Sequence, residues 1–568
     1  MGITAWTWLA VGVTFALYAG VALWSKAHSA VEYYVADRTL HPAVAGMATA
    51  TDWMSAASFM SMAGLVAVMG RDGASYLMGW TGGYVLLAVL LAPYLRKYGK
   101  YTVPQFVGDR YYSEGARFVA ILCAIVISFT YVAGQLRGVA VVLARLLDVQ
   151  VGTAVGVGAV LVLLFAVTGG MKGITAVQVT QYVVIIVAYL VPATFLAILL
   201  TGNPAVPLAP GQPLTAQGAA WLGAPAGQTL LQALGKISED LGLAPLYGGA
   251  RPRLDVLCTT AALMVGTAGL PHIIIRFFTV PKIRDARATA AWALVFIAVL
   301  YLAAPAVAVF ARAGVVATVH DHRREDAPGW LLDWERAGLA SFQDRNGDGR
   351  MQLSGDPAVN EVKVDPDLLV LALPQMARLP AWVVALVAAG ALAAALGTAA
   401  GLVLVIAAAF SHDLVRGYLA PRLSERAELG WARFAATGAV LAAALVALHP
   451  PAAVAQVVAY AFGFAASSFF PVIVLGIFWR RATREGAVAG MISGMTATSL
   501  YITWFAVLRP DLNAPAHWLL GISPEGFGAV GAVVNAAVLV VVSLASRPPP
   551  EEVQRLVASL RYPREAGR

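Results

Sequence analysis

The chain has 568 residues, 59% of them hydrophobic and only 12% charged, with a net charge of +8. Average soluble domains carry about 25% charged residues, so this composition excludes an ordinary soluble protein and indicates an integral membrane protein. The basic residues fall between apolar runs, where they set membrane topology, and we predict no nucleic-acid partner. Cys123 and Cys258 both lie in apolar runs, so no disulfide framework is predicted.

Apolar segments long enough to cross a membrane recur along the chain. A spanning helix needs roughly 20 mostly apolar residues. Thirteen such segments are found, at 5–25, 43–70, 75–95, 118–146, 152–169, 174–200, 255–279, 288–313, 379–410, 431–449, 454–479, 485–508 and 522–545. The sequence therefore predicts an all-α membrane protein with about thirteen transmembrane helices.

The distribution of Lys and Arg predicts the orientation. With the C-terminus inside, 24 of the 39 basic residues face the cytoplasm, Arg276 among them, and the short outer loops carry almost none. We expect a multi-pass protein of a bacterial-type cytoplasmic membrane, with its N-terminus outside and its C-terminus inside. Residues 1–42 form the first helix, which lacks the features of a cleaved signal, and a cytoplasmic loop.

The second predicted segment, 43–70, carries an acid among small and hydroxyl residues. A charged group at the centre of a spanning helix costs at least about 2.5 kcal/mol, so Asp52 normally marks a functional polar interior. Alternatively, Asp52 has a purely structural role and forms hydrogen bonds with nearby hydroxyls and backbone amides. This segment opens a first repeat of five helices, 43–200, which also contains Arg137 at 118–146, in a helix that places it inside the membrane.

The segment 255–279 is interrupted as well. Gly266, Gly269 and Pro271 stand at mid-helix, where a proline removes a backbone donor and frees carbonyls. Interrupted helices at corresponding places in two halves of a transporter point to its binding site, and four predicted helices separate this segment from 43–70, as an inverted repeat of five helices requires. The alternative to a binding site is a proline kink with a packing face of small residues. The second repeat is 255–479, with further helices in 480–546 and a cytoplasmic tail at 547–568.

Two long outer loops interrupt this pattern. Residues 201–254 are rich in Gly, Pro and Ala and predict an extended loop with a short amphipathic piece. The loop 314–378 holds eleven of the 31 acids, including "DRNGDGRMQLSGD" at 344–356. That run places ligand types at EF-hand positions but has Gly355 where a bidentate Glu is usual. The sequence predicts a weak structural calcium site, the alternative being a polar turn, with the ligands Asp344, Asn346, Asp348, the Arg350 carbonyl and Gln352.

Four stretches carry a family resemblance: "ATDWMSAASF" (50–59), "GTAGLPHIIIRFFTV" (266–280), "AAFSHDLV" (408–415) and "FFPVIVLGIFW" (469–479). They resemble the sodium:solute symporter family, and most of all its cation acetate symporter branch. The resemblance implies a leucine-transporter-type inverted-repeat core built from the second to the eleventh helices. It also implies alternating access driven by a sodium gradient.

The resemblance implies a sodium site at matching positions. Its members are carbonyls of Ala50 and Trp53 and, in the eighth core helix, Ala394, Gly397 and Thr398. Gly397 departs from the family, which has a hydroxyl there, so one side-chain ligand is missing. Asp52 matches an acid that supports this site, and proton coupling through Asp52 remains the alternative because a desolvated carboxylate also accepts protons.

The predicted solute is a small monocarboxylate such as acetate. The fork of Arg137 suits a carboxylate, and the remaining substrate candidates are Ser55, Gln135, Gly269 and His272. Pairing of Arg137 with Asp52 is an equal alternative, which would favour a neutral solute such as proline or a sugar. A solute-sensing role on the same core is the third hypothesis. No catalytic constellation or ATP-binding loop is present, so we predict no enzyme; lipid, a small membrane protein or a second copy are the expected partners.

Overall fold

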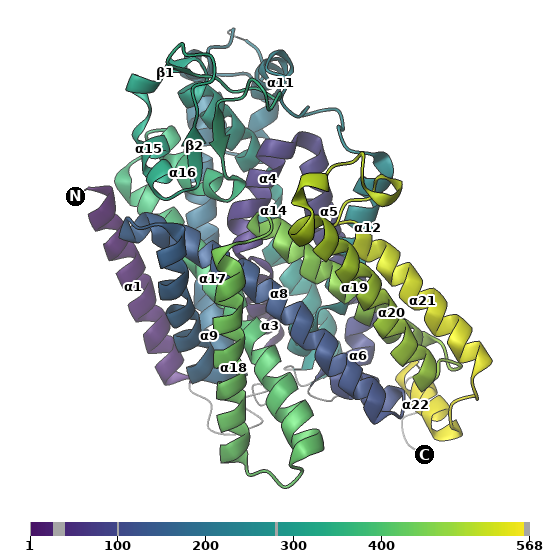
Figure 1. The fold of residues 1–568 in the computed structure, drawn as a ribbon. Coiled ribbons are helices and arrows are strands. Elements are labelled where there is room, and N and C mark those ends of the chain that lie inside the picture. The colour runs from purple at the N-terminus through teal and green to yellow at the C-terminus, as the bar shows by residue number, and fades with distance from the viewer. Residues whose placement is uncertain (1, 26–39, 99–101, 226, 279–281, 562–568) are drawn as a thin grey trace.

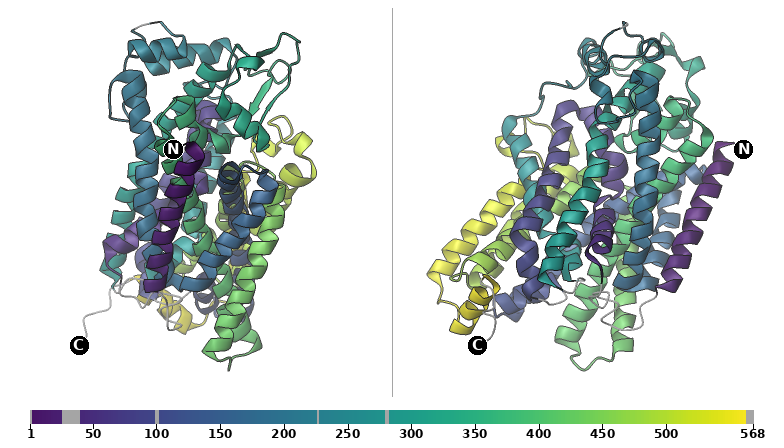
Figure 2. Two further views of the ribbon diagram at one scale, coloured as in Figure 1. Left: turned by 90° about the vertical axis from the view of Figure 1, so that its left-hand side faces the viewer. Right: turned by 180° about the vertical axis from the view of Figure 1, so that it is seen from behind.

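The computed structural model describes residues 2–25, 40–98, 102–225, 227–278 and 282–561. Long helices form a bundle, and the segments of the two long loops gather at the end opposite to the C-terminus (Figure 1). Seen from the side and from behind, the N-terminal helix lies on the outside of this bundle (Figure 2). Most of the expected loop after the first helix, residues 26–39, lies outside the described residues.

Each of the thirteen predicted segments falls on helical chain. The helices of the bundle are α1 (Ile3–Trp24), α3 (Pro42–Trp53), α4 (Met62–Met69), α5 (Ala74–Leu86), α6 (Ala92–Tyr98), α8 (Glu114–Leu147), α9 (Val151–Thr201), α12 (Arg253–Gly269), α13 (Pro271–Ile274), α14 (Ile283–Val319), α17 (Ala381–Ala408), α18 (Glu425–Leu448), α19 (Val454–Phe478), α20 (Arg484–Thr503) and α21 (Phe527–Ala545). The protein is therefore a multi-pass, all-α membrane protein, with only short strands in its outer loop.

By length and apolarity, ten helices of the described chain can cross a membrane, or eleven when the bent pair α12 and α13 counts as one. The difference from thirteen comes from where helices merge and break. The 51 residues of α9 would extend about 77 Å as one straight helix, more than twice the roughly 30 Å hydrocarbon core, so this element contains both predicted segments. The piece Val151–Ala166 is shorter than the usual span.

Shorter elements cover the ends of the bundle. They are α7 (Val103–Arg110), α10 (Ala216–Leu222), α11 (Leu230–Asp240), α15 (Gly329–Arg336), α16 (Leu369–Met376), α22 (Glu551–Arg561), and two antiparallel pairs, β1 (His322–Arg323) with β3 (Arg350–Met351) and β2 (Ala340–Phe342) with β4 (Val362–Val364). The loop 201–254 is thus more ordered than its Gly-Pro-Ala content suggests. Thr229 and Gln232 form a capping box that starts α11.

Both predicted helix interruptions are present. The helix α3 ends at Trp53, and a wide π-type turn over Ala57–Ser61 leads into α4. The helix α12 ends at Gly269, and the chain bends by 47° into Pro271–Phe277. Proline suits the first position of the new helix, because the N–H it lacks would have no partner there. Both breaks lie among buried residues of the bundle.

A segment of the outer loop, Asp365–Leu368, lies against the broken helix, and we call it the outer strap. A Cβ built at Gly64 of α4 would lie 1.9 Å from the Pro366 carbonyl oxygen, so only glycine permits this approach. The Asp367 carboxylate accepts a hydrogen bond from the Val454 N–H, 3.0 Å away, at the start of α19. The outer strap therefore bridges the two repeats at the outer end of the bundle.

Candidate ion and solute site

Asp52 lies at the end of α3 and is 1% exposed. Its Oδ2 accepts a hydrogen bond from Nε of Arg276 at 2.5 Å, forming a buried ion pair. Its Oδ1 accepts a hydrogen bond from the Gln178 amide of α9. Gly401 lets the carboxylate approach α17, because a Cβ there would lie 2.9 Å from Oδ1. Asp52 thus joins the first break to the second and to α9.

The partner of Asp52 corrects two sequence-based expectations. Pairing with Arg137 is wrong, because Arg276 occupies that role. The assignment of Arg276 to the cytoplasmic basic residues is also wrong, since the residue is 2% exposed. Its guanidinium also donates to the Thr175 hydroxyl at 2.9 Å and to the Gln178 side-chain carbonyl at 2.5 Å. The bend at Pro271 turns the chain, and Arg276 with it, toward the interior of the bundle. The distribution of charges along the sequence does not predict this bend.

The positions matched to the sodium site meet around this network. Thr398 of α17 donates from Oγ1 to the carbonyl of Asp52 at 3.0 Å, which places α17 against the end of α3. Gly397 and Ala394 lie on the same fully buried stretch. The carbonyl of Trp53 accepts a hydrogen bond from the Ser58 hydroxyl at 2.9 Å.

Oxygen is the ligand type of this group, and a hard cation prefers oxygen. The Ala50 carbonyl accepts the last helical hydrogen bond of α3, from Met54 N–H at 2.8 Å. The Gly397 carbonyl accepts a hydrogen bond from the Gln178 amide at 3.0 Å. The donor set therefore fits a sodium ion, and these positions remain predictions as ligands.

Three of the substrate candidates converge on the first break. The Tyr131 hydroxyl of α8 donates to Ser55 Oγ at 3.4 Å, and the ring of Tyr131 lies edge-on to His272, with centroids 5.3 Å apart. Gln135, one turn along α8, accepts a hydrogen bond from the Ala56 N–H at 3.0 Å. Gln135 Nε2 and both ring nitrogens of His272 are buried and have no partner among the described residues. Unsatisfied polar groups of this kind are rare inside proteins and call for a ligand or water.

Aromatic rings line the surroundings of these groups. Phe462 of α19 lies within 6.3 Å, centroid to centroid, of Trp53, Trp80 and Tyr131. The other substrate candidate of the second break, Gly269, packs against α19, where a Cβ would lie 2.7 Å from the Ala465 carbonyl oxygen. Gly269 therefore permits close packing and offers no side chain to a solute. The two breaks are therefore joined by aromatic side chains with a few buried polar groups among them, which is the kind of lining that solute sites have.

Arg137 is not part of this centre. Residues two positions apart in an α-helix are separated by about 200° around its axis, so Arg137 and Gln135 face opposite sides of α8. The Arg137 guanidinium lies 3.9 Å from the Asp365 carboxylate of the outer strap. It lines a cavity of about 850 Å³ between the outer loop and the outer ends of α4 and α19. Arg137 therefore lies beside the outer strap and apart from the other substrate candidates.

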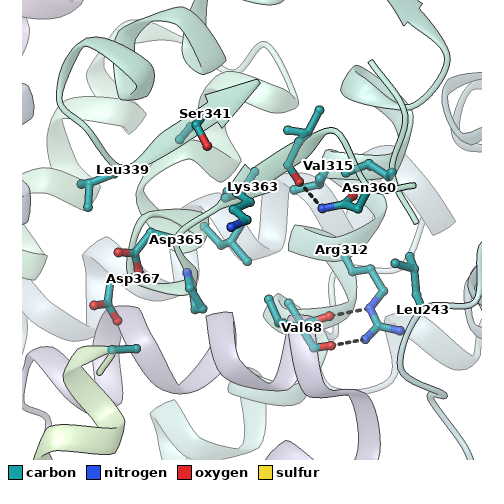
Figure 3. Close-up of a pocket in the computed structure, with 18 of the residues that line it drawn as sticks. Val68, Leu243, Arg312, Val315, Leu339, Ser341, Asn360, Lys363, Asp365 and Asp367 are labelled. Carbon is teal, nitrogen blue, oxygen red and sulfur yellow. Dashed lines mark hydrogen bonds between the residues drawn. The ribbon is translucent and has the colours of Figure 1, made fainter. Parts of the chain in front are cut away.

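This outer cavity is lined by charged residues of both signs. Figure 3 shows Lys363 above Asp365 and Asp367, and Arg312 on the opposite wall. Arg312 donates to the carbonyls of Ala67 and Val68, at 2.5 and 3.2 Å, and so holds the end of α4. Lys363 and Arg137 add positive charge to the lining of this cavity.

The predicted calcium loop forms a compact turn in the outer loop. Asp344 accepts hydrogen bonds from the N–H groups of Gly347 and Gly349, at 2.7 and 3.1 Å, and Asp348 accepts from the side chains of Asn346 and Gln352. Gly355 points away, since its N–H donates to Leu241. The sequence did not single out Glu361, whose carboxylate comes within 4.8 Å of those of Asp344 and Asp348. The calcium site stays a prediction.

Comparison with known proteins identifies the family. The model of the sodium:solute symporter family matches residues 33–326 and 354–494, which is more than half of the chain. The chain belongs to the sodium:solute symporter family. An uncharacterized symporter of Cupriavidus necator is 34% identical over 97% of this chain and 92% of its own. A monocarboxylic acid transporter of Corynebacterium glutamicum is 27% identical over 83% of this chain and 78% of its own.

A solved structure supports the fold of this symporter. A Na⁺-coupled sialic acid symporter in a substrate-bound, outward-open state aligns over 96% of this chain and 98% of its own, with a TM-score of 0.65 at 13% identity. The predicted leucine-transporter-type architecture is thereby confirmed. The protein is a solute symporter of the membrane, and both family and fold are those of transporters.

Proposed function

We propose that this symporter couples sodium entry to the uptake of a small monocarboxylate of the acetate type. The observation that carries the proposal is the set of unsatisfied nitrogens at the first break, Gln135 Nε2 and the two ring nitrogens of His272. Gln135 Nε2 is a neutral donor, and a neutral His272 ring adds one N–H donor beside one acceptor nitrogen. Two neutral donors in a buried place suit a carboxylate, because hydrogen bonds to a charged group are stronger than those between neutral groups. The monocarboxylic acid transporter among the relatives supports this solute class.

The aromatic surroundings limit the size of the solute. The rings of Trp53, Trp80 and Tyr131 all contact Phe462, and Tyr131 contacts both Ser55 and His272. In this proposal such close packing of rings favours a solute of a few carbon atoms over a sugar. Arg137 acts in this proposal as an entry residue, which attracts anions to the outer cavity before they reach the first break.

Sodium is the proposed coupling ion, bound by Ala50, Trp53, Ala394, Thr398 and the backbone of Gly397. Asp52 supports the site by fixing the end of α3. Its main-chain carbonyl accepts a hydrogen bond from the Thr398 hydroxyl, and its carboxylate pairs with Arg276. Both carboxylate oxygens of Asp52 are already engaged, by Arg276 and by Gln178, so Asp52 serves in this proposal as a support of the site and sodium as the coupling ion. The family and the Na⁺-coupled structural neighbour support this choice.

Uptake into proteoliposomes tests the proposal. Labelled acetate, propionate and pyruvate should accumulate with an inward sodium gradient and not with an equal potassium gradient, whereas proline and glucose should not accumulate. Gln135→Glu should abolish carboxylate uptake, because it places a negative charge beside the solute. Arg137→Gln should raise KM and leave kcat unchanged, since it acts at the entrance. Equal carboxylate uptake with sodium and potassium would refute sodium coupling; sodium-driven uptake of proline alone would refute the solute class.

The proposed location is a bacterial-type cytoplasmic membrane with the N-terminus outside. The two long loops lie at one end of the bundle and the C-terminal α22 lies at the other (Figure 1). The charge pattern of the sequence places that C-terminal end inside the cell. The outer cavity then opens to the side from which solute is taken up.

A further inference from the structure

Gly397 leaves the proposed sodium site one side-chain ligand short. Family members have a hydroxyl at this position, and glycine has no side chain to offer. The space where a side chain would begin is not empty, because a Cβ built at Gly397 would lie 2.5 Å from Oε1 of Gln181. Gln181 comes from α9, one turn beyond Gln178.

The side-chain oxygen of Gln181 is itself unexplained. The residue is 1% exposed, and its Oε1 is buried without a hydrogen-bond partner among the described residues. Leaving a buried acceptor unpaired costs about 1–3 kcal/mol, so such a group calls for a missing ligand. Gln181 and Gly397 also line a cavity of about 20 Å³, enough for one particle the size of a water molecule.

The side-chain amide of the neighbouring Gln178 does not supply the missing ligand. Gln178 is fully engaged, since its Oε1 accepts from Arg276 and its Nε2 donates to Asp52 and to the Gly397 carbonyl. Thr51 presents its methyl group to Gly397, since Cγ2 lies 3.3 Å from the same built Cβ, and its hydroxyl turns to the main-chain carbonyl of Gln178 at 2.8 Å. Gln181 is therefore the side-chain oxygen beside Gly397 that is left to meet an ion.

We propose that Gln181 Oε1 is a ligand of the coupling cation and replaces the hydroxyl that Gly397 lacks. An amide oxygen is a hard, neutral donor of the same kind as the backbone carbonyls of the site. The exchange moves the missing side-chain oxygen from α17 to α9. This inference rests on the proposed sodium coupling and names one of its ligands.

The test measures sodium binding directly as well as transport. Sodium is titrated into the purified, full-length protein at constant ionic strength, with potassium as the replacement ion, and the rise in melting temperature gives an apparent Kd. Gln181→Leu, which keeps the size and removes the oxygen, should weaken the apparent Kd about tenfold or more. Thr180→Val is the matched control: its hydroxyl bonds within α9, to the Ala176 carbonyl, and sodium affinity should be unchanged.

A compensating pair makes the test specific. Gly397→Ser alone places a Cβ against Gln181 and should weaken sodium binding. Gln181→Ala with Gly397→Ser removes the collision and restores a hydroxyl, so the double variant should recover to within about threefold of the wild-type Kd. Gln181→Glu keeps an oxygen and adds a negative charge, so it should tighten binding even if Gln181→Leu fails to fold.

The outcomes separate this inference from the proposed function. Sodium stabilisation of the wild type with unchanged affinity in Gln181→Leu, or with no recovery in the double variant, overturns the role of Gln181 and leaves sodium coupling intact. Weaker binding by Gln181→Glu also overturns it. If sodium has no effect on the wild type in binding or in transport, sodium coupling itself fails and this ligand assignment fails with it.

Discussion

The buried pair of Asp52 and Arg276 is the residue-scale feature on which the centre depends. Each charge is almost completely removed from solvent, and each has further hydrogen-bond partners in α9. Removing water from two charges costs several kcal/mol each, and only close geometry with satisfied hydrogen bonds offsets that cost. The pair is therefore required as a unit.

Neutralising one partner should destabilise the protein more than neutralising both. Asp52→Asn or Arg276→Gln alone leaves an uncompensated buried charge, with an expected loss of about 3–5 kcal/mol of stability. The double variant should regain most of the melting temperature, because no buried charge remains. It should still fail in sodium-driven uptake, since the support of the ion site is lost. A double variant no more stable than either single one would contradict this account.

The sequence allowed Asp52 to be predicted as functional, because an acid within an apolar segment is costly and conspicuous. Its partner could not be predicted in the same way. Arg276 stands near the end of an apolar run, close to Lys282 and Arg284, and by position alone it belongs to a cytoplasmic group of charges. Only the bend after Gly269, which depends on packing against α19, turns it inward.

Among the elements, the outer strap ties the loop to the moving parts expected of a transporter. It lies on α4 through Pro366 and on α19 through Asp367, so it touches both repeats. Burial, together with the negative charge of Asp365, raises the pKa of Asp367 from its ordinary value of 3.8 to about 7. The packed strap thus favours the protonated carboxyl.

This pKa predicts that the docking of the outer strap loosens as pH rises from about 4 to about 7. A carboxyl whose pKa is raised by folding gives its full stability below the unfolded pKa and loses it as pH rises through the folded pKa. Amide hydrogen exchange of Asp365, Asp367 and Leu368, corrected for the intrinsic rate, should therefore become faster over this range and change no further above it. Asp367→Asn should abolish the pH dependence.

Asp365→Asn provides the control for this experiment. It removes the neighbouring negative charge, so the pKa of Asp367 falls and the transition should move to lower pH. Exchange that slows with rising pH would contradict the assignment of the transition to Asp367.

Helices and their breaks could be predicted from the sequence because both rest on local chemistry. Apolar runs of about 20 residues predict spans, and the small residues around Asp52 and Pro271 predict interruptions. The outer strap depends on contacts between residues about 300 positions apart, such as Gly64 and Pro366, which no local pattern reveals. Glu361 could not be assigned to the predicted calcium loop for a different reason: it lies 17 positions after Asp344, beyond the twelve-residue EF-hand pattern, and reaches the turn only through the fold of the loop.

On the scale of the whole molecule, the two ends of the bundle differ in what they carry. One end holds the outer loop with its helices and strands, and the other holds α22 (Figures 1 and 2). Ser341 in β2 and Ser559 in α22 are both exposed and lie at these two ends.

Cysteine labelling of intact cells tests the proposed orientation. In a background with Cys123 and Cys258 replaced by alanine, Ser341→Cys should react with a membrane-impermeant maleimide added outside. Ser559→Cys should react only after the membrane is permeabilised. The two variants control for one another, since both replace a serine by a side chain of similar size. The reverse pattern would invert the topology.

The ion pair between α3 and the second break also bears on the electrical behaviour of the transporter. Asp52 and Arg276 cancel one another, so this pair contributes no fixed charge to the centre. A sodium ion entering alone would bring an uncompensated charge into a medium of low dielectric constant, and so would a carboxylate. Arriving together they neutralise each other, so each lowers the cost of the other's entry. With one ion per carboxylate, the loaded carrier would cross with no net charge, and the membrane voltage would exert no force on that step.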